Sequence, residues 1–315
     1  MQPFADRLTS AITASGSVLV AGLDPKLEEI PGYLVSKHKS AQSAGQNWGA
    51  SVEGILREYI DDVLPLLAGR VAAIKPNLAF YEQYGSHGLA AFSYLMSRAK
   101  ELSLLSIADA KRGDIGSTAQ AYSAAFLGRV RVFGEAHPVF DADALTVSPY
   151  LGFDTLEEYL KDCVQYGKGL FVLVKTSNPG SAALQGVSNT DGTTVAAKVA
   201  SWVCERGSEL MGPCGLSGLG AVVGATYPAE ARELRALMPK SFFLIPGLGA
   251  QGGSAADAVS GFTAQRPPRG GIVNVSRGIF SFSNAATLSK QSFTEEVVKR
   301  IDGFNASLRV ALSTS

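Results

Sequence analysis

The sequence predicts an α/β fold, a (β/α)8 TIM barrel formed by residues 1–315 as a single domain, with insertions after strands 1 and 5. Eight short runs rich in Val, Ile and Leu recur, and each ends in a polar or glycine-containing turn followed by a segment with a helical pattern. The runs are apolar along their whole length, as strands of a parallel sheet covered on both faces must be. One barrel of this kind fits a chain of 315 residues, so we prefer it to the two domains that length alone suggests.

The expected strands lie, in chain order, within residues 17–24, 70–77, 105–111, 142–150, 169–177, 220–226, 242–249 and 270–277. Helical patterns lie between them, for example at 155–167 and at 228–238, where Glu230 and Arg232 are expected on the solvated side of an Ala/Leu face. A doubly wound sheet is the structural alternative. The chain shows no obvious dinucleotide fingerprint, so the barrel is favoured.

Composition excludes several classes of protein. Lys and Arg number 28 and Asp and Glu number 28, so the net charge of zero argues against broad nucleic-acid binding. The three cysteines form no C-x-x-C pair, which indicates neither a disulfide framework nor a zinc site. No apolar run is long enough for a membrane span, and the first residues show helical spacing rather than a signal peptide's apolar core. We therefore expect a soluble protein of the cytoplasm.

Two long connections follow expected strands, residues 25–52 after the first and 178–216 after the fifth. Barrel active sites are built from the loops at these strand ends, although for most of the residues in these two connections we favour surface decoration. The role of 25–52 stays open at this point. Residues 264–271 are expected to form a turn before the last strand.

A charged pair at the end of the third expected strand is the most informative feature. Asp109 and Lys111 are two positions apart, so on a strand they project to the same side, which in a barrel can be the interior. Buried charges need a partner or a substrate, and a structural ion pair is the alternative to a catalytic role. Asp114 falls beyond the strand, where it could face a neighbouring subunit.

Two further charges end neighbouring strands. Lys75 lies near the end of the second run and Asp24 ends the first. With Asp109 and Lys111 they make an alternating set of two acids and two amines from three strands, and such charges could hold one another in place.

Glycine-rich segments close the seventh and eighth strands. Residues 245–253 (IPGLGAQGG) and 274–278 (NVSRG) let the backbone approach an anion, and Arg277 offers a fork for its oxygens. Barrels commonly bind phosphate at this place.

After the fifth strand, residues 175–182 (KTSNPGSA) either present Ser177 to a polar ring or form a plain turn. The three histidines are scattered, so we expect no metal site.

These motifs resemble the orotidine 5′-phosphate decarboxylase family, in its longer-chain, type 2 branch. The resemblance runs from FADRL at residue 4 to VNVSRGI at residue 279, with D-x-K-x-x-D at 109–114 as its most specific feature. IKPN, TSNPG, PGLGAQGG and VSRG occur in the family's order. The resemblance implies a carboxy-lyase that converts orotidine 5′-phosphate to UMP and CO2 in de novo pyrimidine synthesis. It also implies a homodimer and no metal or organic cofactor.

The resemblance carries roles for individual residues at the reacting end of the substrate. Asp109 would lie beside the substrate carboxylate, and Lys111 would protonate C6 of the pyrimidine. Lys75 would belong to the charge array and, with Asp24, contact the ribose. Ser177 would face the pyrimidine edge.

Other roles implied by the resemblance lie farther from the reacting carbon. Gln251 and Arg277 would hold the phosphate within a loop that includes Gly249, Gly252 and Gly278. Asp114 and Thr118 would reach into the neighbouring subunit's site. The resemblance gives no role to Arg112, for which we expect only a solvated or interface charge.

Elementary chemistry agrees with this assignment. Loss of CO2 leaves a carbanion with no electron sink, so the site must supply a fixed positive charge that can also deliver a proton, as Lys111 can. Metal-dependent sugar-phosphate decarboxylases and aldolases of the same superfamily are the nearest alternative. They resemble this chain but have an acidic metal ligand where it has Lys75, whose ammonium would repel Mg²⁺. A non-catalytic phosphate-binding barrel would lack the charge array, and too little chain remains for a second, fused enzyme.

Overall fold

The computed structural model describes residues 1–43, 47–249, 252–265 and 269–314. Within them, one parallel sheet of eight strands has the order β2-β1-β10-β9-β8-β7-β6-β3. The strands are β1 (Leu19–Leu23), β2 (Ala73–Pro76), β3 (Ile107–Arg112), β6 (Ala144–Val147), β7 (Gly169–Lys175), β8 (Ser217–Val223), β9 (Ser241–Pro246) and β10 (Gly271–Val275). All eight overlap the runs expected from sequence.

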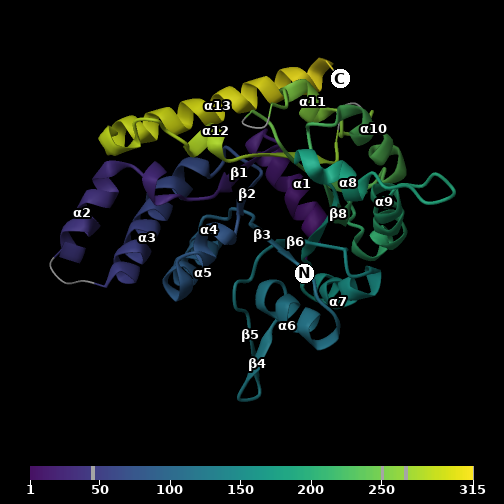
Figure 1. The fold of residues 1–315 in the computed structure, drawn as a ribbon, viewed down its shortest axis with the longest axis horizontal. Coiled ribbons are helices and arrows are strands. Elements are labelled where there is room, and N and C mark those ends of the chain that lie inside the picture. Colours follow the sequence, from purple (N-terminus) through teal and green to yellow (C-terminus); the bar gives the residue numbers. More distant parts are fainter. Residues whose placement is uncertain (44–46, 250–251, 266–268, 315) are drawn as a thin grey trace.

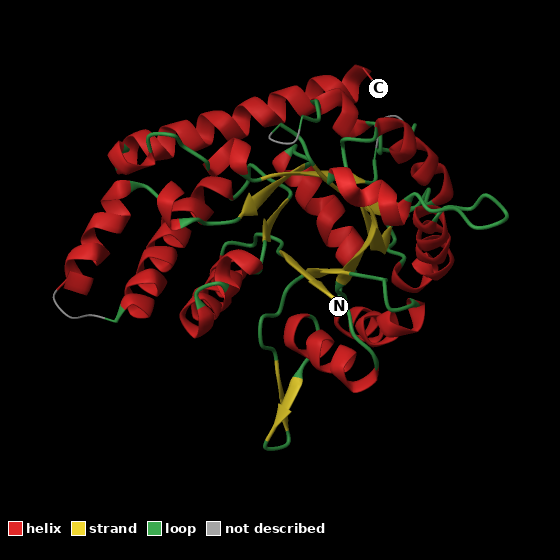
Figure 2. Ribbon diagram, in the orientation of Figure 1, coloured by secondary structure: helices red, strands yellow, loops and turns green. Residues whose placement is uncertain are grey.

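The sheet closes on itself between its two end strands. Parallel bridges join Ile74 to Ser106 and Asn77 to Asp109, and the Ile74 N–H donates to the Leu105 carbonyl at 2.8 Å. Figure 2 shows the strands as a ring surrounded by helices. The predicted (β/α)8 TIM barrel is therefore confirmed, and the doubly wound alternative is wrong.

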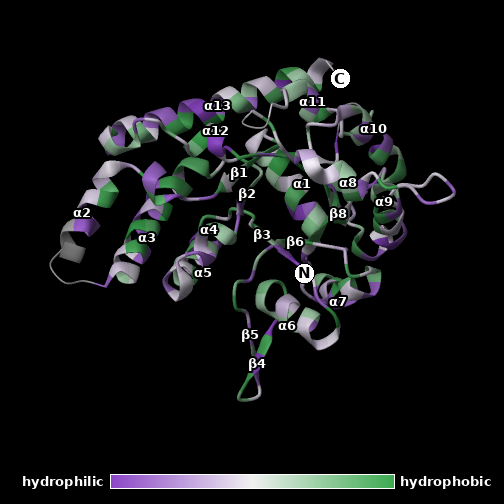
Figure 3. Ribbon diagram, viewed as in Figure 1, coloured by the Kyte–Doolittle hydropathy of each residue, from purple (hydrophilic) through white to green (hydrophobic). Residues whose placement is uncertain are grey.

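Helices connect and cover the strands (Figure 1). They are α1 (Phe4–Ser15), α2 (Gly32–Ser43), α3 (Trp48–Leu67), α4 (Ala79–Glu82), α5 (Gly85–Glu101), α6 (Gly116–Phe126), α7 (Glu157–Tyr166), α8 (Ala182–Gln185), α9 (Val195–Arg206), α10 (Pro228–Leu237), α11 (Ala255–Val259), α12 (Arg277–Phe280) and α13 (Lys290–Thr314). Hydrophobic and hydrophilic residues alternate along α3, α5 and α13, as helices with one buried face require (Figure 3).

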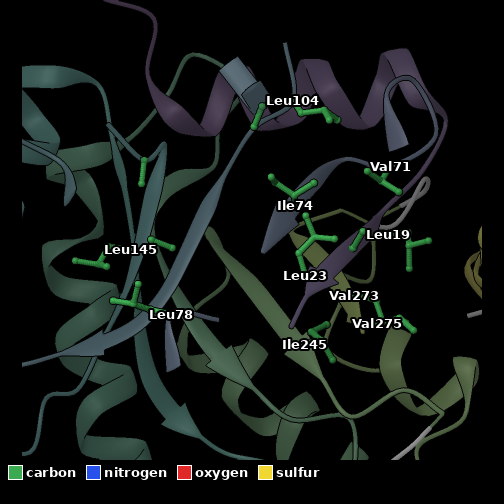
Figure 4. Close-up of a cluster of buried hydrophobic side chains, with 14 of the residues drawn as sticks. Leu19, Leu23, Val71, Ile74, Leu78, Leu104, Leu145, Ile245, Val273 and Val275 are labelled. Atoms are coloured by element: carbon green, nitrogen blue, oxygen red, sulfur yellow. The ribbon is translucent and has the colours of Figure 1, made fainter. Parts of the chain in front are cut away.

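The main core lies between the strands and their covering helices. Leu19, Ile74 and Val273 belong to neighbouring strands and are fully buried in this cluster (Figure 4). A second cluster fills the inside of the barrel. There α1 contributes Phe4 and Leu8, and Phe4 contacts Phe171 of β7 edge to face with ring centroids 6.0 Å apart. The N-terminal helix expected from its apolar spacing thus packs against the barrel interior.

The insertion after β1 is helical. A 3-10 turn, Leu27–Glu29, leads to α2, which packs on α3 through a Tyr33–Asp62 hydrogen bond of 2.7 Å and a Lys37–Glu58 ion pair of 2.5 Å. The insertion after β7 holds the 3-10 turn Pro179–Ser181, α8 and then α9, whose first turn is capped by the Thr194 hydroxyl. Part of the turn expected at 264–271 lies outside the described residues.

One element was not expected from sequence. An antiparallel hairpin of β4 (Val130–Val132) and β5 (Glu135–His137) projects from the connection between α6 and β6 (Figure 2). Its turn places Phe133 and Gly134 at φ +53° and +90°, the left-handed values that a tight hairpin turn needs. Each strand has only three residues, too short for an alternating pattern to stand out in the sequence.

A buried arginine ties the later units of the barrel together. Arg235 of α10 is 7% exposed, and its guanidinium lies 3.7 Å from the Phe243 ring centroid. It donates four hydrogen bonds of 2.7–2.8 Å to main-chain carbonyls, those of Gly261, Met238, Ser241 and Gly270. These bonds join α10 to the segments flanking β9 and β10.

Candidate active site

A cavity of about 670 Å³ opens at the carboxyl ends of the strands. Period-two alternation along each strand explains its floor, since an apolar residue fills the barrel interior and the residue two positions later reaches the cavity. On β2 this pair is Ala73 and Lys75, and on β3 it is Ile107 and Asp109. The strands therefore place charged side chains next to the apolar interior of the barrel.

The expected charge array is assembled on this floor. The Lys75 ammonium donates to Asp109 Oδ2 at 2.7 Å, and the Lys111 ammonium donates to Asp109 Oδ1 at 2.7 Å. Asp24 lines the same cavity and accepts the Asn77 N–H at 3.2 Å. Lys75 and Asp109 are 5% and 8% exposed, whereas the Lys111 side chain is 48% exposed toward the cavity mouth.

Electrostatics keeps the buried members of the array ionised. Burial alone would raise the pKa of Asp109, but the charges and hydrogen bonds of Lys75 and Lys111 outweigh it and hold that pKa well below its ordinary value. Burial likewise opposes the charge on Lys75, and the carboxylates of Asp109 and Asp24 more than compensate, raising the pKa of Lys75. The floor is thus a fixed row of alternating charges.

The contact between Lys111 and Asp109 does not arise from the regular alternation of side chains along a strand. The pairing of β3 with β6 is irregular between Ala108 and Arg112, and Lys111 itself has a left-handed backbone with φ +46°. The two side chains meet as expected, but across a bulge rather than on a regular strand.

One wall of the cavity comes from the ends of β7 and β8. Ser177 lines the cavity, and Gly224 permits the close approach of these loops, because a Cβ at Gly224 would lie 2.9 Å from the Ser177 Cα. Lys175 is 2% exposed and pairs with Glu230 of α10 at 2.7 Å. Glu230 therefore does more than face solvent, and the ion pair joins α10 to β7, the strand that precedes Ser177.

The opposite wall includes part of the first insertion. Lys26, Glu29 and Ile30 line the cavity there. Burial tends to raise the pKa of Glu29, but Lys26, Ser281 and Arg277 together lower it. This segment of 25–52 thus contributes to the site, and the positive charge of Arg277 acts on the Glu29 carboxylate.

The predicted phosphate end is placed in part. Arg277 and Gly278 line the cavity after β10, while Gln251 lies outside the described residues. Gly249 and Gly252 have φ +77° and +91° and shape the turn. Their N–H groups donate to the carbonyls of Gly253 and Gly249 within the loop, so in this structure neither is free to bind an anion.

Among the described residues, Asp114 and Thr118 do not line the cavity, and neither do Gly249 and Gly252. Asp114 is half-buried and its carboxylate accepts the Ile115 N–H at 2.8 Å, while Thr118 is exposed in the first turns of α6. Arg112 is neither simply solvated nor part of the array, since it pairs with Glu82 at 2.5 Å.

The model of the orotidine 5′-phosphate decarboxylase / HUMPS family matches residues 18–291, which include all eight barrel strands. The chain belongs to this family. It is 43% identical over 279 residues to an orotidine 5′-phosphate decarboxylase of Rhodopirellula baltica, covering 89% of this chain and 88% of the relative. It is 40% identical over 288 residues to that of Caldicellulosiruptor bescii, covering 90% and 92%.

Solved structures agree with this family membership. A Streptomyces avermitilis protein superposes with a TM-score of 0.75 at 33% identity, covering 99% of this chain and 97% of the other. The OMP decarboxylase of Leishmania donovani superposes with a TM-score of 0.65 at 30% identity, covering 97% and 100%. Membership of the family that the motifs resemble is therefore confirmed.

Thr146 of β6, which lines the cavity beside Asp109, was not singled out in the sequence analysis. Its hydroxyl is within 3.0 Å of both the Asp109 carboxylate and the Lys111 N–H. The sequence did contain a signal for Thr146, because it stands two positions after Ala144, whose side chain lies in the barrel interior.

Among the described residues, no helix is long and apolar enough to span a membrane. In the same part of the chain, no group of three His, Cys, Asp or Glu residues lies close enough together to hold a metal ion.

Proposed function

We propose that this chain decarboxylates orotidine 5′-phosphate to UMP and CO2, the carboxy-lyase reaction of de novo pyrimidine synthesis. The observation that carries the proposal is the Lys75–Asp109–Lys111 row on the cavity floor, with 2.7 Å contacts on both sides of the carboxylate. The row lies in the same cavity as Arg277, which a phosphate at the other end of the substrate would require.

The reaction requires a positive charge close to C6 of the pyrimidine and a group that can donate a proton to that carbon. The bond between C6 and the carboxylate breaks, CO2 departs, and the electron pair remains on C6. The Lys111 ammonium stabilises that pair by its charge and then transfers a proton to C6, giving UMP and a neutral amine that regains a proton from water. Lys111 is suited to this because its side chain is half exposed toward the cavity mouth.

Asp109 and Lys75 prepare the site for this step. Asp109, kept ionised by its two lysines, would lie beside the substrate carboxylate and disfavour the bound ground state. Lys75 balances Asp109 and, with Asp24, would contact the ribose hydroxyls. Ser177 would face the pyrimidine edge from the β7 wall.

Binding at the phosphate end would accelerate chemistry at the other end, because remote binding energy can stabilise the closed, reactive site. Arg277, with Gln251, would hold the phosphate oxygens. The loop glycines Gly249, Gly252 and Gly278 would let the chain approach it. In the described conformation Gly249 and Gly252 contribute turn shape rather than N–H donors.

No metal or organic cofactor is needed in this scheme. Lys75 occupies the end of β2, within 2.7 Å of Asp109, and its ammonium disfavours a divalent cation beside that carboxylate. This feature supports the decarboxylase over the metal-dependent sugar-phosphate enzymes. We further propose a cytoplasmic location, in keeping with three free cysteines.

We also propose a homodimer in which Asp114 and Thr118 complete the partner's site. The loops after β3 and β6 are joined by the Ser148 N–H, which donates to the Arg112 carbonyl at 2.8 Å. Beyond them Ile115, Tyr150 and Leu151 are 62%, 76% and 53% exposed. Exposed apolar side chains on the loops after two neighbouring strands support an interface there.

Turnover of orotidine 5′-phosphate tests the reaction. We expect the purified protein to convert it to UMP, identified by chromatography, with one CO2 released per UMP. A folded protein that leaves the substrate intact and instead converts a sugar phosphate in the presence of Mg²⁺ would overturn the proposal.

Mixed subunits test the shared site. Lys111→Ala and Asp114→Ala proteins should each be impaired, and mixing them should restore activity through heterodimers that contain one intact site. Absence of recovery, with subunit exchange verified by mass spectrometry, would contradict the proposed role of Asp114.

A further inference from the structure

Thr146 lies on the cavity floor, where its hydroxyl contacts both the Asp109 carboxylate and the backbone of Lys111. It is 1% exposed and lies on β6. Its hydroxyl Oγ1 is 3.0 Å from Asp109 Oδ1 and 3.0 Å from the Lys111 backbone nitrogen. A backbone N–H only donates and an ionised carboxylate only accepts. The hydroxyl must therefore accept from Lys111 and donate to Asp109.

The register of the two strands explains why this contact exists. Leu145 pairs with Ala108 and Val147 pairs with Arg112, so the single residue Thr146 stands opposite three residues of β3. A bulge of this kind disrupts the main-chain ladder and turns a side chain toward a site. The Thr146 hydroxyl provides the acceptor for the N–H of Lys111, the bulged residue with φ +46°.

The same hydroxyl helps fix the Asp109 carboxylate. Oδ1 accepts from Thr146 and from the Lys111 ammonium, while Oδ2 accepts from the Lys75 ammonium. Thr146 thus holds Lys111 at its backbone and Asp109 at its carboxylate. One side chain sets the position of the proton donor relative to its neighbouring charge.

We propose that Thr146 is a positioning residue for the decarboxylation, acting through Lys111 and Asp109; the inference rests on the function proposed above. A valine of nearly the same shape would leave the Lys111 N–H and one Asp109 oxygen without this partner. The left-handed backbone at Lys111 would then lose a restraint, and displacement of a reacting group by about 1 Å can cost roughly a hundredfold in rate.

Steady-state kinetics of Thr146→Val and Thr146→Ser, with UMP binding measured by calorimetry, test the inference. We expect Thr146→Val to lower kcat roughly ten- to a hundredfold, as loss of hydrogen bonds to charged groups does, with KM and UMP affinity within about threefold of wild type. Thr146→Ser keeps the hydroxyl and should restore kcat to within about threefold of wild type. Counting UMP sites by calorimetry normalises kcat to folded protein.

Ser217→Ala is the matched control. The Ser217 hydroxyl is fully buried at the start of β8, where it accepts the Leu219 N–H at 3.0 Å and donates to the Gly207 carbonyl at 2.7 Å. Its loss should lower thermal stability without lowering kcat per binding site. Wild-type kcat in Thr146→Val, or equal losses of kcat in Thr146→Val and Ser217→Ala, would overturn the inference. Failure of the wild-type protein to decarboxylate the substrate would instead overturn the proposed function.

Discussion

Replacement of Lys111 by alanine removes the group on which the proposed reaction depends. The Lys111 ammonium lies 2.7 Å from Asp109 Oδ1, and in the proposed reaction C6 takes its proton. The variant should still fold, because Asp109 keeps its 2.7 Å ion pair with Lys75. We expect turnover to collapse while UMP still binds.

The size of the loss follows from two contributions. A unit charge about 4 Å from a developing carbanion stabilises it by roughly 4 kcal/mol near a protein surface and by about 1 kcal/mol in bulk water. The 48% exposure of the Lys111 side chain places it between these limits, which corresponds to about five- to a thousandfold in rate. Loss of the general acid adds roughly a hundred- to ten-thousandfold. We therefore expect kcat to fall by at least about five hundredfold.

Ultraviolet-monitored loss of orotidine 5′-phosphate measures this change, with UMP binding as the test of an intact site. Lys161→Ala is the matched control, since Lys161 is an exposed lysine on α7 that pairs with Glu158. It should retain wild-type turnover. A Lys111→Ala protein with kcat within tenfold of wild type would refute the assignment of Lys111 as proton donor.

Three further changes test the surrounding structure. The pKa of Asp109 is depressed in the folded protein, so its stabilisation is complete above the unfolded value of about 4 and is lost as pH falls below it. Urea unfolding at pH 6 and pH 3 should therefore show a smaller acid loss in Asp109→Asn than in wild type, and equal losses would argue against the buried array. Gly224→Ala should raise KM roughly tenfold, because its Cβ would lie 2.9 Å from Ser177 Cα; an unchanged KM would show that Ser177 does not contact substrate. Arg235→Met should lower the free energy of unfolding by about 3 kcal/mol or more through the loss of four buried hydrogen bonds, and a loss below about 1 kcal/mol would contradict their importance.

The barrel could be predicted because its strands carry a strong local signal. Continuous apolar runs such as 169–177 report burial on both faces, and all eight correspond to strands. The hairpin of β4 and β5 carries no such signal. It is stabilised by a turn at Phe133 and Gly134 and packs little apolar surface, leaving Phe133 fully exposed.

The charged part of the site could also be predicted, for a geometric reason. Charges are costly in an apolar strand, so Asp109 and Lys75 stand out, and parallel strand ends bring them to one rim. The bulge at Lys111 could not be foreseen, since it depends on how β3 pairs with β6. Threonine is common in strands, so Thr146 became informative only when the structure placed it between Asp109 and Lys111.

The Lys175–Glu230 pair shows a further limit of local reasoning. Helical periodicity placed Glu230 on a solvated face, and its side chain is indeed 44% exposed. Its 2.7 Å contact with the buried Lys175 joins residues from two different β/α units. Spacing within one helix cannot reveal a partner that only the closed barrel brings near.

The central claim is that lysine charges on the cavity floor perform this decarboxylation without a metal. Its most direct test is the rate of orotidine 5′-phosphate loss, followed by ultraviolet absorbance, with protein treated with EDTA and then assayed with and without added Mg²⁺. We predict conversion to UMP at the same rate in untreated, EDTA-treated and Mg²⁺-supplemented protein. Activity that disappears with EDTA and returns with Mg²⁺ would contradict the claim.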